Sequence, residues 1–303
     1  MAKKQEQGIL GRAMLANIKI GVWEARKNDK QITNKVNTEY AASNEAGRYH
    51  KHLFGGPVEE LSKLVTASHY LRWTHYAQTL PWSDSGWRLL PTANHMEYLK
   101  IMREKRADFD AAVDVFVAAY PRLVLDARAK LNGMYKESDY PSVEAVRRKY
   151  HSDLQFDPIP SGEDFRVSLP SEEMKRIAKE VEERMANNVA SAMQDAWIRL
   201  GTMVEELKSK LENDAKGLRG ATLGDAVKVE RLSLSDLADV LGRLNLTQDA
   251  ALEKARKQVQ TQLATLNVET LKKDDIARKK ATLAVDDILK QVRSVYSPAQ
   301  EDE

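Results

Sequence analysis

Residues 102–123 read MREKRADFDAAVDVFVAAYPRL, and apolar side chains recur in this stretch every seven residues. Two interleaved rows are Met102, Phe109, Phe116 and Leu123, and then Val113, Tyr120, Ala127 and Met134. Two such heptad rows, four residues apart, predict one apolar seam along a long helix. Because a proline inside a helix removes one backbone hydrogen bond, we expect helix over about 92–119, a kink at Pro121, and helix again to about 131.

Shorter elements precede this helix. Alternation of apolar and polar residues at 18–22 predicts a strand, and residues 33–44 are expected to form a short helix. Pro57 follows two glycines and suits the first turn of a helix that reaches about residue 78. Residues 81–91 are bounded by prolines and contain the turn-forming run Asp84-Ser85-Gly86, so we expect a loop there.

A β-hairpin and more helices follow the predicted long helix. Alternating apolar residues on both sides of the run DPIPSGED predict a hairpin over about 154–169 that pairs with the early strand. Ser171, followed by two acids, predicts the start of a long helix that ends near 217–220. Two or three further helices are expected over 233–296, with starts at SLSD and LTQD. The predicted fold class is therefore mainly α, with long antiparallel helices and a small β-hairpin or sheet. We place a soft boundary between an α+β domain at 1–170 and a helical region at 171–303.

Composition limits the classes of function. The chain of 303 residues has 47 Lys and Arg against 45 Asp and Glu, a net charge of +2, which is not the footprint of a dedicated duplex-DNA binder. The absence of cysteine excludes disulfides, thiolate nucleophiles and Cys-ligated zinc. The N-terminal run lacks the apolar core of a signal peptide, and no run of residues is apolar enough to span a membrane. We expect a soluble protein of the cytoplasm.

Catalytic motifs are missing from the sequence. It contains no G-x-x-x-x-G-K-[ST], G-x-G-x-x-G, G-x-S-x-G or H-E-x-x-H, so no catalytic residue and no cofactor is assigned. His50 and His52 are weak candidates for metal ligands, because alternate residues of an extended segment face the same side. A third ligand would have to come from elsewhere, with His95 or His75 as candidates. The simpler interpretation is a polar loop beside a Gly-Gly turn.

The run HYLRWTHYAQTLPWSDSGWRLLP, residues 69–91, holds three of the five tryptophans. On the predicted helix, Tyr70, Trp73 and Ala77 form a stripe of the kind that is usually core. The tryptophans of the loop either plug it onto the body, or bind a protein, or stack on single-stranded nucleic acid beside arginine. The candidate partner-binding residues are Arg72, Trp73, Tyr76, Trp82, Trp87 and Arg88.

Charge patterns and the heptad seam leave two further interpretations open. The basic runs at 146–150, 252–258 and 277–281 could bind phosphates, but nearby acids favour solvated faces of mixed charge. The seam could also lie between chains and drive self-assembly, because heptads look alike in either setting.

Several runs together resemble a known group of proteins. They are IGVWEARK at 20–27, TLPWSDSGWRLLPTANHMEYLKIMREKRADFDAAV at 79–113, YPSVEAVRRKY at 140–150 and FDPIPSGEDFRVSLPSEEMKRI at 156–177. The chain resembles an uncharacterised family encoded by tailed phages and prophages, whose genes often neighbour those of a MoxR-type AAA+ ATPase and a von Willebrand A protein. The resemblance implies a phage accessory protein in the host cytoplasm and brings no catalytic residues.

The leading hypothesis is a non-enzymatic accessory protein that binds another macromolecule, with a protein favoured as the partner. That partner could be a MoxR-type ATPase or a second copy of the chain. One alternative is a protein that binds single-stranded DNA or RNA. The other is a metal-dependent enzyme that uses His50 and His52.

Overall fold

A computed structural model describes residues 11–43, 45–83, 85–160, 171–213, 215–229 and 232–295. The chain forms two compact units, each built from segments that are apart in the sequence. Unit 1 comprises Met1–Asn17, Tyr76–Tyr98 and Phe156–Glu303, and unit 2 comprises Ile18–His75 and Leu99–Gln155. Helix predominates and a small sheet accompanies it, which confirms the predicted fold class. The predicted boundary near residue 170 lies outside the described residues and stays a prediction.

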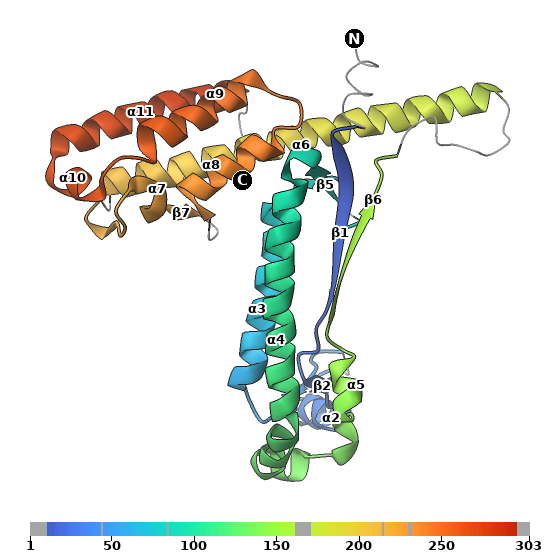
Figure 1. Ribbon diagram of the computed structural model, residues 1–303. Coiled ribbons are helices and arrows are strands. Elements are labelled where there is room, and N and C mark those ends of the chain that lie inside the picture. Colours follow the sequence, from blue (N-terminus) through green and yellow to red (C-terminus); the bar gives the residue numbers. More distant parts are fainter. Residues whose placement is uncertain are drawn as a thin grey trace. The chain divides into compact units, whose positions relative to one another are not determined.

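Unit 2 contains a two-stranded ribbon and the larger parts of two long helices (Figure 1). Its elements are β2 (Arg26–Asn28), α2 (Lys30–Glu39), β3 (His50–His52), α3 (Glu59–Ala77), α4 (Thr92–Leu131), the 3-10 turns η1 (Asn132–Met134) and η2 (Glu137–Asp139), and α5 (Val143–Arg147). The last residues of α3 and the first of α4 belong to unit 1. An ion pair of 2.6 Å joins Arg122, late in α4, to Glu60, early in α3, so the two helices run antiparallel. The predicted helix over 33–44 is α2, which begins earlier because Asp29 caps it before residue 30. It also ends earlier, at Glu39.

The heptad seam of α4 lies inside unit 2. Seven of its eight side chains are buried by the chain itself, and the eighth, Met134, is half-buried. Phe116 makes edge-to-face contacts with Phe54 and Tyr150, at centroid distances of 6.0 and 5.7 Å. The seam is thus covered within one chain, and the interpretation that places it between chains is wrong. The two predicted helical segments on either side of Pro121 are one continuous helix.

A four-stranded sheet has the strand order β4-β5-β1-β6. Its strands are β1 (Ala13–Gly21), β4 (Leu80–Pro81), β5 (Arg88–Pro91) and β6 (His151–Asp157). The sequence predicted a loop over residues 81–91. The structure instead has β4 and β5 in this region, and they form a hairpin in which Leu80 pairs with Leu89. The early strand and the strand after residue 150 are confirmed as neighbours. The second strand of the predicted hairpin falls at 161–170, outside the described residues.

Unit 1 is built around α6 (Ser171–Asn213). The other elements are η4 (Ala215–Gly217), α7 (Leu223–Ala226), β7 (Lys228–Val229), β8 (Leu232–Ser233), α8 (Leu234–Leu244), α9 (Ala250–Gln258), the π-helical turn η5 (Val259–Leu263), α10 (Val268–Lys273) and α11 (Asp275–Val295). The predicted start at Ser171 is confirmed, but α6 ends before the predicted 217–220. The starts at SLSD and LTQD are also confirmed, because Ser233 and Asp249 cap α8 and α9. The predicted number of helices in the last third was too low, since four α-helices lie within 233–295.

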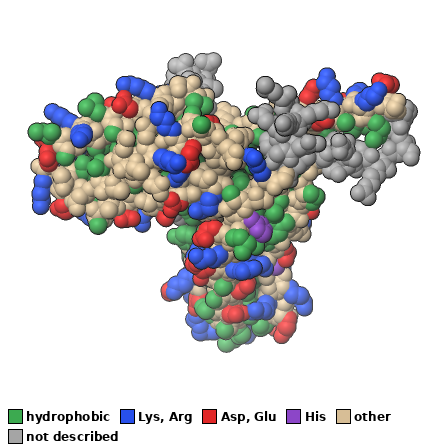
Figure 2. Space-filling view, turned by 45° about the horizontal axis from the view of Figure 1, so that its top comes forward, with side chains coloured by type: hydrophobic (Ala, Val, Ile, Leu, Met, Phe, Trp, Pro, Cys, Tyr) green, Lys and Arg blue, Asp and Glu red, His purple; other side chains and the backbone are tan. Residues whose placement is uncertain are grey.

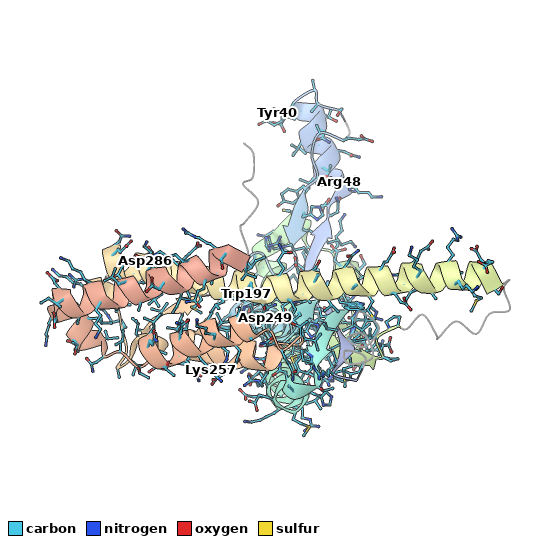
Figure 3. The ribbon with its side chains drawn as sticks, turned by 90° about the horizontal axis from the view of Figure 1, so that it is seen from above. Tyr40, Arg48, Trp197, Asp249, Lys257 and Asp286 are labelled. Atoms are coloured by element: carbon cyan, nitrogen blue, oxygen red, sulfur yellow. The ribbon has the colours of Figure 1, made fainter. Side chains whose placement is uncertain are left out.

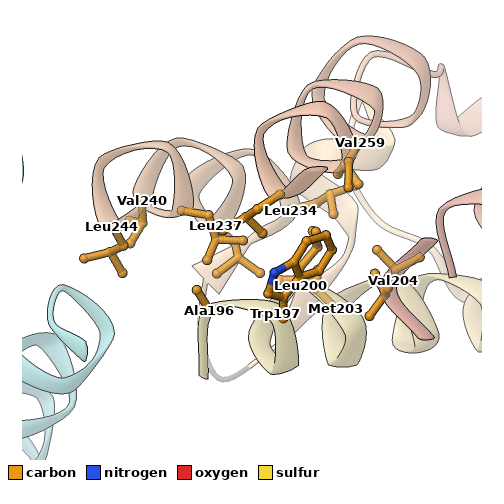
Figure 4. Close-up of a cluster of buried hydrophobic side chains, with 14 of the residues drawn as sticks. Ala196, Trp197, Leu200, Met203, Val204, Leu234, Leu237, Val240, Leu244 and Val259 are labelled. Atoms are coloured by element: carbon orange, nitrogen blue, oxygen red, sulfur yellow. The ribbon is translucent and has the colours of Figure 1, made fainter. Parts of the chain in front are cut away.

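The core of unit 1 forms where α6 packs against α8, α11 and the segments between them. Trp197 of α6 is buried among leucines such as Leu200 and Leu237 (Figure 4). Its indole Nε1–H donates to Asp249 Oδ2 at 3.0 Å, and the other carboxylate oxygen of Asp249 caps α9. Packing and a hydrogen bond thus fix this tryptophan together.

The surface of the described chain is polar and of mixed charge. On the face in Figure 2, lysines and arginines are interspersed with acids. None of the helices described here is both long enough and apolar enough to cross a lipid bilayer.

Candidate protein-binding surface

The tryptophans predicted as a binding loop sit on the hairpin of unit 1. Trp82 and Trp87 are half-buried and pack against the core of that unit. This contact favours the interpretation in which the two rings pack the hairpin against the core of the unit. Their role in binding a partner stays a prediction.

Arg88 and Arg199 hold the end of α3, where backbone carbonyls lack helical partners. Arg88 donates from Nε to Thr79 Oγ1 at 2.8 Å, and its guanidinium lies 4.3 Å from the centre of the Tyr76 ring. Arg199 of α6 donates to the carbonyls of Tyr76, Ala77 and Thr79 at 2.9–3.2 Å. Burial, and next the charge of Arg199, lower the pKa of Arg88 to about 10. Arg88 is therefore occupied within unit 1.

The other predicted residues are divided between the two units. Arg72 is exposed and Trp73 half-buried, and both belong to unit 2, whereas Tyr76 is exposed and belongs to unit 1. The neighbouring Tyr70 was expected in the core but is exposed, so the predicted core stripe is wrong at this position.

His50 and His52 lie on β3, which pairs antiparallel with β2. His50 stands opposite Asn28 and His52 opposite Arg26, while the intervening Lys51 is buried. Both imidazoles therefore share one face of the ribbon, as alternation requires. Within the described residues, however, no group of three or more His, Asp or Glu side chains is placed to hold a metal ion. His95, one of the suggested third ligands, belongs to unit 1.

Helix α2 buries polar side chains and leaves apolar ones exposed. Its buried side chains are the polar Thr33 and Asn37. Its exposed side chains include Val36, which is 42% exposed, and Tyr40 at its end, which is 77% exposed. Figure 3 shows Tyr40 at the tip of α2 and Arg48 on the segment that returns from it. A surface helix normally buries its apolar side chains, whereas Val36 and Tyr40 stay exposed beside the buried Thr33 and Asn37.

Hydrogen bonds hold the inner side of α2. The Asp29 carboxylate caps the helix by accepting from the N–H groups of Gln31 and Ile32 at 3.1 and 3.2 Å. The Thr33 hydroxyl donates to the Asp29 carbonyl at 2.8 Å and accepts from the Tyr49 N–H at 3.0 Å. The helix is thus fixed without burial of its apolar side chains.

A buried ion cluster lies directly behind this cap. Lys51, which is 3% exposed, lies 2.7 Å from Asp139 Oδ2 and 3.4 Å from Asp29 Oδ2. Lys51 also donates to the Met134 carbonyl at 2.8 Å. Lys27 stands opposite Lys51 on the ribbon, and its Nζ lies 2.5 Å from Asp139 Oδ1. Asp139 therefore separates two like charges that would otherwise repel across the strands.

The cluster shifts the titration of its members. The N–H of Ile32 lowers the pKa of Asp29 below its usual range, and Lys51 adds to this effect against the opposing burial. Burial alone would raise the pKa of Asp139, but hydrogen bonds from Lys27 and Lys51 outweigh it and lower that pKa. Burial lowers the pKa of Lys51, and its bonds to Asp139 and Asp29 more than reverse this. All three groups are thus held in their charged forms.

Charge is unevenly divided between the units. Unit 2 has 20 lysines and arginines against 15 aspartates and glutamates, and unit 1 has 27 against 30. Near the outward side of α2, Lys30, Lys35 and Arg48 are exposed, with Glu39 as an acid on the same helix. We define the α2 surface as Val36, Tyr40, Arg48 and Tyr49, all of which are exposed. It is apolar, aromatic and set in a positively charged unit.

Several cations of the basic runs form ion pairs with nearby acids. Arg147 pairs with Asp114, and Arg256 and Lys257 both pair with Glu253, at 2.8 and 3.2 Å. Of the third run, Lys279 and Lys280 are exposed. These contacts favour the interpretation as solvated faces of mixed charge.

Comparisons with protein-family models, with curated proteins and with solved structures found no match to this chain. The resemblance to the phage family therefore stays a prediction that rests on the four sequence runs.

Proposed function

We propose that this protein is a non-enzymatic adaptor that binds an acidic protein through the α2 surface. The exposure of Val36 and Tyr40 on α2 is the observation that carries this proposal. Because they are exposed, these two side chains contribute little to the stability of the helix. They would contribute more on contact with a second surface.

The composition of the α2 surface suits a protein partner. Tyrosine and arginine are enriched among the residues that carry most of the binding energy of protein interfaces. Tyr40 presents a large ring with few rotatable bonds, so its ordering costs little entropy. Val36 lies one helical turn before Tyr40, so both side chains lie on one side of α2.

The charge of unit 2 supports an acidic partner. An excess of five positive charges, with Lys35 and Arg48 near the apolar stripe, would attract a negative surface and repel a positive one. Exposed charges act mainly on the rate of association and are screened by salt. A MoxR-type ATPase, which the family resemblance implies, is the first purified partner to test.

The experiment compares two double variants of unit 2. Val36→Ser with Tyr40→Ser removes the outward stripe of α2. Val115→Ser with Leu125→Ser removes two side chains of α4 that are 56% and 71% exposed, and serves as the matched control. A photo-crosslinking residue at position 36, introduced in cells, identifies the partner, and calorimetry with purified proteins measures affinity.

We expect the α2 variant to weaken binding at least about tenfold, because one large buried side chain contributes about 1.5–3 kcal/mol. The α4 control should bind like the wild type, and circular dichroism should be unchanged for both. Equal affinity of wild type and α2 variant would exclude this surface. Binding of a labelled oligothymidine at low salt, lost only in the α2 variant, would instead assign it to nucleic acid.

A further inference from the structure

Unit 2 holds a groove of about 380 Å³ that the sequence did not predict. Its floor is the first half of α3, and its walls are the start of β2, the end of β3 and the turn that follows β3. The residues that line it are Glu24, Ala25, Arg26, His52, Phe54, Gly56, Pro57, Val58, Leu61, Ser62, Val65, Thr66 and His69. A volume of this size accommodates a small ligand or a few residues of a peptide.

Ionisable side chains gather around this apolar floor without partners of their own. Arg26 and His52 are cross-strand neighbours on one face of the ribbon, and His69 lies opposite them on α3. Within the described residues, none of these three side chains makes a hydrogen bond or an ion pair, and neither does Glu24. Three donor side chains of the groove are therefore available to a ligand.

The walls of the groove have strained backbone. Ala25 is buried and has a φ of 51°, a conformation that non-glycine residues rarely adopt. Its carbonyl accepts from the Leu53 N–H at 2.9 Å, which ties the two walls together. Backbone strain at a non-glycine residue occurs more often at positions where a ligand is held.

We propose that the groove binds a carboxylate carried on an apolar group, such as a hydrophobic residue at the end of a peptide. The Arg26 guanidinium pairs with the carboxylate, and the imidazoles of His52 and His69 donate further hydrogen bonds. The apolar group lies against Leu61 and Val65. Because Glu24 carries a negative charge, it repels a doubly charged phosphate more than a single carboxylate.

This inference is independent of the α2 surface. Its residues are different, and either site can exist without the other. Arg48 of the α2 surface therefore provides a control within the same unit.

The experiment measures binding by NMR of the full chain labelled with ¹³C in its histidines. Variants His52→Gln and His69→Gln assign the two imidazole signals, and His50→Gln assigns a histidine of β3 that does not line the groove. The probes are 4-phenylbutyrate, its neutral amide and phenyl phosphate. We expect 4-phenylbutyrate to shift the signals of His52 and His69 to saturation, with little effect on His50.

Substitution of Arg26 tests whether its guanidinium binds the carboxylate. Arg26→Gln should weaken 4-phenylbutyrate at least about tenfold, since it removes a charge-assisted hydrogen bond, while Arg48→Gln leaves the affinity unchanged. Equal binding of the amide would reduce the groove to an apolar site and overturn the proposal. Tighter binding of phenyl phosphate would overturn the choice of carboxylate. The absence of any saturable shift would overturn the site itself.

Discussion

Replacement of Lys51 by methionine tests whether the ion cluster behind α2 holds unit 2 together. Methionine keeps most of the buried stem of the lysine and removes its charge. Asp29 and Asp139, both buried, would then face each other without the cation that lies between them. Lys27 would still pair with Asp139, but the buried Asp29 would lose its ion pair with Lys51 and face a second carboxylate. Like charges in one buried cluster are unfavourable, so we expect a carboxylate to take up a proton or the cluster to open.

The magnitude follows from the contacts of the Lys51 ammonium. Two of them, to Asp139 at 2.7 Å and to the Met134 carbonyl at 2.8 Å, have hydrogen-bond length. Loss of one partner from a buried ion pair destabilises by about 3–5 kcal/mol. Lys27→Met is the matched control, because Lys27 pairs with the same Asp139 but its side chain is 51% exposed. An exposed pair contributes only about 0–1 kcal/mol.

Hydrogen exchange followed by mass spectrometry measures this locally, in peptides that cover α2 and the ribbon. For Lys51→Met we expect exchange in these peptides to be about a hundredfold to a few thousandfold faster, and for Lys27→Met less than about tenfold faster. Peptides from α8 and α11, in unit 1, serve as the internal reference. Equal acceleration by the two variants would refute the reasoning, since the buried Lys51 contacts both carboxylates whereas the half-exposed Lys27 contacts Asp139 alone.

The pH dependence of stability provides a second test of Lys51→Met. The pKa values of Asp29 and Asp139 are lowered on folding, so their contribution is present above the ordinary value of 3.8 and is lost as the pH falls through the folded values. The pKa of Lys51 is raised, so its contribution is present below 10.5 and is lost as the pH rises through the folded value. In Lys51→Met, protonation relieves the repulsion between the carboxylates. Urea unfolding measures the difference in the free energy of unfolding between wild type and Lys51→Met. We therefore expect this difference to become smaller from neutral pH to about pH 3.

Two further variants test helix ends in unit 1. Ser233→Ala removes a capping box, in which the Ser233 hydroxyl accepts from the Asp236 N–H at 3.1 Å, and should destabilise α8 by about 1 kcal/mol in hydrogen exchange; unchanged protection of α8 would contradict this. Arg199→Met removes three hydrogen bonds to the end of α3, and we expect about 2–4 kcal/mol less protection in residues 76–91. Arg199→Lys should recover only part of it, because an ammonium lacks the planar fork of the guanidinium, and full recovery would show that charge alone matters.

The helices could be predicted because their signals are local. The heptad rows of α4 record which side is buried, and Ser171, Ser233 and the run LTQD mark helix starts through the chemistry of capping. The end of α6 was misplaced because glycines at 217 and 220 come after the helix has already stopped. Periodicity identifies a helix more reliably than its last turn.

The hairpin and the ribbon could not be predicted, because they depend on pairing between distant segments. Pro81 suggested a loop, yet it lies on β4, an edge strand where a missing N–H is tolerated. The ribbon strands have three residues each, too few to show alternation. Aromatic density drew attention to Trp82 and Trp87, whereas the groove takes its residues from three separate segments and leaves no local signal.

The orientation of α2 is a tertiary property, and the ion cluster explains it. In KQITNKVNTEY, the spacing of Ile32, Val36 and Tyr40 predicts an apolar side but not the direction in which it points. Asp29 joins the two features, since its carboxylate caps α2 and also lies in the cluster with Lys51. Polar bonds therefore fix the inner side of the helix, at the free-energy cost of burying charge. Val36 and Tyr40 therefore stay exposed, which the proposed binding surface requires.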